Sequence, residues 1–136
     1  VQNYFEQYLG QFPAQVFDRI NENFIRCSFF ELCSRYLSSC YTFAIEQNNS
    51  AGRSDFEMTG IPGTDYYKDD RLAEFKYFKA KEAERMLALS DPRPEDVAQV
   101  LAYAKDTKEK FPHYHVRSYI VYICANKGWK CWEVTP

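Results

Sequence analysis

Two features common in other protein classes are missing from this sequence. No stretch reaches the ~20 consecutive apolar residues that cross a bilayer, and the first ten residues, VQNYFEQYLG, have neither the basic nor the apolar segment of an export signal. The net charge is only −2, so the chain has no overall positive field. We therefore expect a cytoplasmic protein without a membrane segment, in which any nucleic-acid contact depends on a local basic patch or on metal ions.

Paired cysteine motifs are missing as well. The five cysteines form no CxxC pair, and no histidine accompanies them at the spacing of a zinc site. We expect all five to be reduced thiols, which excludes a disulfide-stapled secreted domain.

Aromatic residues are what the sequence has in excess. They make up 18% of the 136 residues, with 11 Tyr and 11 Phe against 5 Gly, while 46% of the residues are hydrophobic and 26% are charged. This balance is typical of a globular chain, and the length fits one domain. We expect a single domain over residues 1–136, with residues 1–12 as an N-terminal extension at the end of a linker from an upstream domain.

Hydrophobic periodicity and turn residues predict an α/β fold. The expected order is one or two abutting helices, three strands, two helices and two strands, with a loop over 47–52. A helical connection between the third and fourth strands favours a parallel pair, so we expect a mixed sheet of about five strands flanked by helices. The helices are expected over 13–38, 80–89 and 94–111, and the strands over 41–46, 54–59, 71–78, 116–124 and 129–134.

The third predicted strand carries charge on an otherwise apolar face. Residues two apart on a strand share a face, so Glu74 and Lys76 project together, in line with Leu72 and Phe78. Charged residues that alternate on a strand in this way usually face solvent. Because the neighbours of Glu74 and Lys76 on this face are apolar, we instead expect a buried pair that needs a partner, a metal ion or a polar network.

The preceding strand supplies a second carboxylate. An antiparallel hairpin of the second and third strands places the start of one beside the end of the other, so Asp55 can meet Glu74 and Lys76. Two carboxylates are suitable ligands for Mg²⁺, which keeps several waters and takes phosphate oxygens as further ligands. Lys76 beside such an ion can orient or deprotonate a water and stabilise negative charge at phosphorus.

These residues resemble a known family. Asp55 after Gly52-Arg53-Ser54, an eighteen-residue spacer and then Glu74-Phe75-Lys76 look like the signature of the PD-(D/E)xK nuclease superfamily. With Pro62-Gly63-Thr64 in the hairpin loop and Gln99 and Tyr103 in the following helix, the chain from Asn21 to Val134 is similar to the nuclease-like domain found C-terminal to an AAA-ATPase-like domain. Ser54 stands where the family often has a proline, a position that varies across the superfamily.

The resemblance implies a restriction-endonuclease-like fold with an αβββαβ core and a catalytic set of Asp55, Glu74 and Lys76. In this set Asp55 and Glu74 bind Mg²⁺ or Mn²⁺, and Lys76 activates water. Related enzymes often add a carboxylate from the first core helix, for which Glu22 is the candidate and Glu31 the alternative.

The resemblance also implies a supporting role for Gln99 and Tyr103. The two residues are four apart and share a helix face. That face lies roughly 110–150° from the stripe of Val97, Leu101 and Ala104 at 100° per residue. If the stripe packs on the sheet, the pair is either polar surface or part of a helix that packs on two sides.

Basic residues cluster near the end of the third strand. Arg53, Lys79 and Lys81 can hold a nucleic-acid backbone, or they can belong to a solvated helix start. We expect metal-dependent phosphodiester hydrolysis on nucleic acid, DNA in the first instance, with an ATPase domain of the same full-length chain as a further partner. The alternative is a catalytically silent nuclease-fold module that binds nucleic acid or a partner domain.

Overall fold

The computed structural model describes residues 2–49 and 52–136, apart from the side chains of residues 2, 4, 46–49 and 52–54. It contains four α-helices, one 3₁₀ helix and five strands within these ranges. In chain order they are α1 (Gln2–Gly10), the 3₁₀ helix Ala14–Asp18, α2 (Glu22–Leu37), β1 (Tyr41–Asn49), β2 (Gly52–Gly60), β3 (Asp69–Phe78), α3 (Ala80–Leu87), α4 (Pro94–Lys110), β4 (His115–Cys124) and β5 (Gly128–Val134).

The five strands form one mixed sheet in the order β1-β2-β3-β4-β5. Neighbouring strands are antiparallel except for β3 and β4, which run parallel over ten residue pairs from Asp69↔His115 to Phe78↔Cys124. The connection between these two strands contains α3 and α4, as a parallel pair requires. The α/β class, the antiparallel β2–β3 pair and the parallel β3–β4 pair are confirmed.

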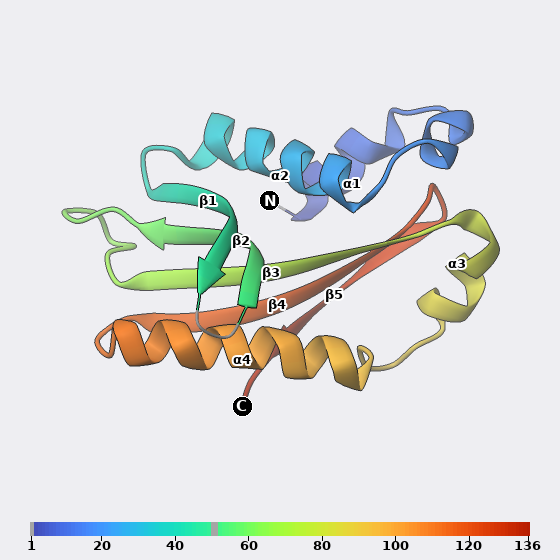
Figure 1. Ribbon diagram of the computed structural model, residues 1–136. Coiled ribbons are helices and arrows are strands. Elements are labelled where there is room, and N and C mark those ends of the chain that lie inside the picture. The colour runs from blue at the N-terminus through green and yellow to red at the C-terminus, as the bar shows by residue number, and fades with distance from the viewer. Residues whose placement is uncertain (1, 50–51) are drawn as a thin grey trace.

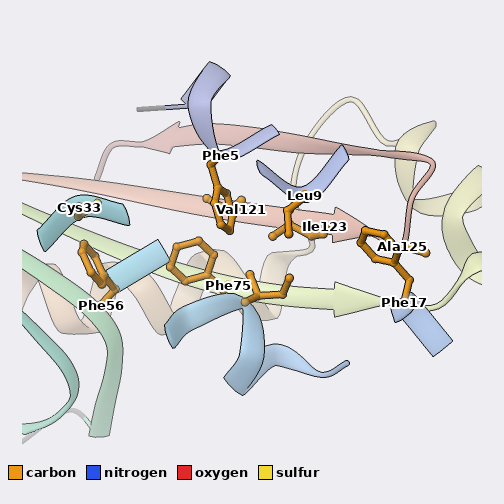
Figure 2. Packing of buried hydrophobic residues seen from close by; sticks show 10 residues of the cluster. Phe5, Leu9, Phe17, Cys33, Phe56, Phe75, Val121, Ile123 and Ala125 are labelled. Carbon is orange, nitrogen blue, oxygen red and sulfur yellow. The ribbon is translucent and has the colours of Figure 1, made fainter. Parts of the chain in front are cut away.

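Helices cover both faces of the sheet (Figure 1). The residues of β3 alternate between the two layers, because successive side chains of a strand point to opposite faces. Phe75 belongs to the core under α1 and α2, which Figure 2 shows from close by, whereas Phe78 belongs to the core under α3 and α4. The charged residues Glu74 and Lys76 share the face of Phe78.

Helix α2 begins at a capping residue, and α1 is held by packing on the sheet. Asn21 caps α2, since its side-chain oxygen accepts a hydrogen bond from the backbone N–H of Phe24 at 3.0 Å. Helix α1 lies within the segment expected to be an N-terminal extension, and it packs on the sheet through Phe5 and Leu9, which are 0% and 7% exposed. Within the described part of the chain, no helix combines the length and the apolar character that a membrane crossing needs.

The β1–β2 hairpin is longer than the sequence pattern predicts. The expected loop over 47–52 is wrong for residues 47–49 and 52, because ladder pairing continues to Asn49↔Gly52; residues 50 and 51 lie outside the described residues. Polar composition was the basis for predicting a loop. Backbone ladder bonds do not depend on apolar side chains, however, and an antiparallel ribbon can be exposed to water.

A close backbone contact at Gly60 gives a first prediction. A Cβ placed on Gly60 would lie 1.5 Å from the carbonyl oxygen of Tyr66, so the loop after β2 has to move in Gly60→Ala. We expect this variant to lose at least about 1–3 kcal/mol of unfolding free energy, the usual cost of overpacking. The matched control is Gly10→Ala, where no atom lies within 4 Å of the added Cβ. Urea unfolding of both variants is the measurement, and equal stabilities would contradict the role given to Gly60.

Candidate functional site

Strand β3 brings Glu74 and Lys76 together on the α4 side of the sheet. Their side chains form an ion pair with 3.2 Å between Lys76 Nζ and Glu74 Oε1. Glu74 is 2% exposed, and Leu72 and Phe78 on the same face are also buried. The prediction that this charged pair lies on a coreward face is confirmed.

Asp55 reaches the same place from β2. The ladder between β2 and β3 reaches only as far as the pair Phe56↔Ala73, so Asp55, the residue preceding Phe56, lies just outside it. Its side chain continues the connection, because Asp55 Oδ2 accepts a hydrogen bond from the backbone N–H of Phe75 at 2.9 Å. The other carboxylate oxygen, Oδ1, lies 2.8 Å from Nη1 of Arg26, and both side chains of this ion pair are about nine-tenths buried.

Helix α2 contributes Glu22 and Arg26 to this end of the sheet. Glu22 Oε1 accepts a hydrogen bond of 3.4 Å from the backbone N–H of Tyr77, next to Lys76. Glu31, the alternative carboxylate, instead pairs with Arg35 at 2.8 Å on the exposed side of α2. The structure therefore brings Glu22, and not Glu31, close to Lys76.

Burial and charge act differently on the two members of the β3 pair. Burial raises the pKa of Glu74 to about 7, and the negative charge of Asp55 adds to this, while Lys76 only partly offsets it. Burial opposes the charge on Lys76, but the carboxylates of Glu74, Glu22 and Asp96 outweigh burial and raise the pKa of Lys76. Lys76 is therefore a protonated cation at neutral pH, a hydrogen-bond donor and not a base.

Asp96 is a further carboxylate at the site that sequence reasoning assigned only to the start of a helix. It is 3% exposed, and its charge acts on both Glu74 and Lys76. Arg93 Nε lies 2.9 Å from Asp96 Oδ2, which also accepts the Tyr122 hydroxyl hydrogen bond. The three-residue spacing of Arg93 and Asp96 could have predicted their ion pair. Nothing in the sequence shows that this pair lies beside β3.

Gln99 and Tyr103 lie on the sheet side of α4. The buried stripe of this helix is Asp96, Val100, Tyr103, Asp106 and Thr107. The expected stripe of Val97, Leu101 and Ala104 is only partly buried, and Val97 and Leu101 pack against the edge of the core under α3 and α4. The helix packs further around its circumference than the apolar residues indicate, because Tyr103 also buries its ring and its hydroxyl accepts a hydrogen bond from the Gln99 side chain. Gln99 Nε2 lies 2.9 Å from that hydroxyl.

A groove of about 670 Å³ opens beside this cluster, between the start of α2 and the start of α3. Arg26 and Glu22 line one side of it, and Tyr77, Lys79 and Lys81 line the other. Lys79 and Lys81 are exposed. The side chain of Arg53, the third predicted basic residue, lies outside the described part of the structure.

The residues present fit a divalent cation. Glu74 Oε2 is fully buried and has no hydrogen-bond partner in the described part of the chain, and a buried acceptor without a partner is costly. A cation ligated by this oxygen would satisfy it and would also relieve the repulsion between Glu74 and Asp55. Among the side chains that the structure describes, no three of His, Cys, Asp or Glu gather as a metal-binding group. A metal ion here would therefore rely on two carboxylates, water and substrate oxygens, as Mg²⁺ commonly does.

A second buried carboxylate lies on the same face of β3 but takes no part in this cluster. Asp70 is 1% exposed, and burial together with the neighbouring Glu57 raises its pKa to about 8. It lies four residues from Glu74, roughly 13 Å along the strand. Asp70 thus provides an internal comparison for Glu74.

Comparison with known proteins shows the family of the chain. The family model described as the PD-(D/E)XK nuclease superfamily matches residues 20–133, which contain every residue of the cluster. No curated protein matches the chain.

The raised pKa of Glu74 predicts a pH-dependent gain in stability for Glu74→Gln. A carboxyl whose folded pKa of about 7 exceeds its ordinary value of 4.5 destabilises the fold increasingly as pH rises between these values. The amide removes this penalty, so we expect the variant without added metal to gain about 1–3 kcal/mol above pH 7 and little at pH 4. Thermal unfolding between pH 4 and pH 8 measures it. Glu31→Gln is the control, and its difference in stability from the wild type should not change with pH. A pH-independent difference for Glu74→Gln would contradict the burial argument.

Proposed function

Because the chain belongs to the PD-(D/E)XK nuclease superfamily, we propose that it hydrolyses phosphodiester bonds in nucleic acid, with DNA as the substrate, at the cluster of Asp55, Glu74 and Lys76. The observation that carries the proposal is the buried Glu74 carboxylate: its Oε2 has no hydrogen-bond partner among the described residues, its Oε1 pairs with Lys76, and it is repelled by the charge of Asp55. Such an arrangement is costly in a protein interior. Its presence is explained if the oxygen binds a cation during function.

Asp55 and Glu74 are the proposed ligands of a Mg²⁺ or Mn²⁺ ion. When bound, this ion supplies Lewis-acid chemistry at the phosphorus. The backbone N–H of Phe75 and the guanidinium of Arg26 hold the Asp55 carboxylate in one orientation. Glu74 is fixed by the strand and by Lys76, so both ligands are placed before any substrate arrives.

Lys76 acts as a cation in this proposal. Its raised pKa keeps three N–H donors available at neutral pH, which can orient the attacking water and stabilise the negative charge that develops on the phosphate. Glu22 contributes through its charge, which helps to keep Lys76 protonated. Gln99 and Tyr103 are proposed to support the sheet-facing side of α4, on which Asp96 is carried.

The groove beside the cluster is the proposed path of the nucleic-acid backbone. Lys79 and Lys81 are exposed at its edge, and phosphates are commonly held by such lysines. Arg53 is proposed to extend this contact from the β1–β2 hairpin. We further propose that the domain acts in the cytoplasm together with an AAA-ATPase-like domain of the same full-length chain, as the sequence resemblance implies.

One observation favours the alternative of a catalytically silent module. Both proposed metal ligands already have cationic partners, Arg26 on Asp55 and Lys76 on Glu74. A module of this kind would bind nucleic acid or a partner domain without divalent metal. The two functions differ in metal binding and in cleavage, so they can be separated directly.

Cleavage by Lys76→Ala tests the proposed chemistry. We expect the wild-type chain to cut single- or double-stranded DNA in Mg²⁺ or Mn²⁺, and the variant to be slower by about 10²–10³-fold, the usual effect of removing one donor to the developing charge. Lys108→Ala, an exposed substitution on α4, is the matched control. Equal rates for wild type and Lys76→Ala would overturn the mechanism, and a wild type that neither cuts nucleic acid nor binds divalent metal would favour the silent module.

Metal-induced stabilisation tests the ligands separately from cleavage. We expect millimolar Mn²⁺ to raise the Tm of the wild type and of Asp70→Asn, because binding to the folded state alone stabilises it. The shift should disappear in Asp55→Asn and Glu74→Gln. Asp70 is an informative control, since it is as buried as Glu74 and lies on the same face of the same strand. A shift that persists in Glu74→Gln would show that the metal binds elsewhere.

A further inference from the structure

Arg26 is an unusual neighbour for a metal-binding carboxylate. Its side chain extends from α2, where Nη1 lies 2.8 Å from Asp55 Oδ1 and Nη2 lies 3.0 Å from Asn23 Oδ1. The residue is only 7% exposed. A guanidinium stays charged at any pH of interest. A permanent cation is thus built into the site beside Asp55.

Both oxygens of Asp55 are committed in this arrangement. Oδ1 faces Arg26, and Oδ2 accepts the N–H of Phe75. A carboxylate that bridges two metal ions has to direct one oxygen at each of them. A second divalent ion at Oδ1 would lie beside the buried Arg26 guanidinium, and the two positive charges would repel each other. The oxygen without a partner is on Glu74 instead.

We propose that Arg26 takes the place of a second divalent cation, so that the site holds a single metal ion between Asp55 and Glu74. This inference rests on the proposed function, because it concerns the same two carboxylates. Arg26 is a positioning residue in this arrangement: it orients Asp55 and supplies positive charge on the side of Asp55 that faces α2.

The charges around the site support one ion and oppose two. Among the side chains that the structure describes, four carboxylates and three cations pair within this cluster or act on it through their charge, leaving an excess of one negative charge. The carboxylates are Asp55, Glu74, Glu22 and Asp96, and the cations are Arg26, Lys76 and Arg93. One divalent ion therefore leaves the cluster near neutrality, whereas two would leave three positive charges in a largely buried region, where charge is least tolerated.

Counting Mn²⁺ ions tests the proposal without measuring cleavage. The full chain is titrated with Mn²⁺ alone, with bound metal measured by calorimetry and free Mn²⁺ by electron paramagnetic resonance. We expect one ion per wild-type chain. In Arg26→Gln the cation at Asp55 is removed, so we expect a second ion, or one ion bound at least about tenfold more tightly. Arg35→Gln, which removes an exposed arginine from the same helix, should bind one ion with wild-type affinity.

Several outcomes would overturn the inference. Two ions on the wild type would do so while leaving the proposed function intact, as would one ion on Arg26→Gln with a less than tenfold gain in affinity. Absence of binding to both chains would overturn the inference and the proposed metal-dependent function together. If circular dichroism shows that Arg26→Gln does not fold, Arg26→Lys keeps a cation at this place; two ions bound to it, or to the wild type, would contradict the proposal.

Discussion

The point at which β2 leaves β3 determines the geometry of the site. Beyond the pair Phe56↔Ala73 the backbone N–H of Phe75 loses its strand partner, and an unsatisfied N–H in the core costs about 1–3 kcal/mol. Asp55 satisfies it with a side-chain oxygen. The same separation of the strands gives Arg26 access from α2. The Asp55 carboxylate, the Arg26 guanidinium and the backbone N–H of Phe75 therefore depend on one another. A change in one of them removes a partner of another.

This arrangement lowers the stability of the fold but keeps charged side chains in place for the proposed chemistry. Glu74 and Asp55 repel each other in a region where burial already disfavours the Glu74 anion. Lys76 and Arg26 reduce the repulsion without filling the last oxygen of Glu74. A buried pair of amides would avoid these costs, but amides would bind a divalent cation weakly. The physical cost is thus confined to the residues that the proposed chemistry requires.

Period-two alternation and antiparallel pairing were enough to place Asp55, Glu74 and Lys76 together from the sequence. Arg26 and Asp96 were not identified, since their positions depend on how α2 and α4 rotate and lean against the sheet. The rotation of α4 could not be read from apolar residues, because polar and aromatic side chains such as Asp96 and Tyr103 occupy its buried face. The extent of the β1–β2 hairpin was also missed, since backbone pairing there does not depend on side-chain hydrophobicity.

The aromatic excess of the chain contributes to the site from the opposite face of the sheet. Phe75 stands between Glu74 and Lys76 in sequence and is 0% exposed on the α2 side, where its ring lies 5.1 Å from that of Phe29 and 6.4 Å from that of Phe56. Since side chains alternate along a strand, anchoring this ring fixes the direction in which its two charged neighbours project. Rotating Glu74 and Lys76 out toward water would require removing Phe75 from a packed cluster of rings, which holds the charged pair on the coreward face despite the cost of burial.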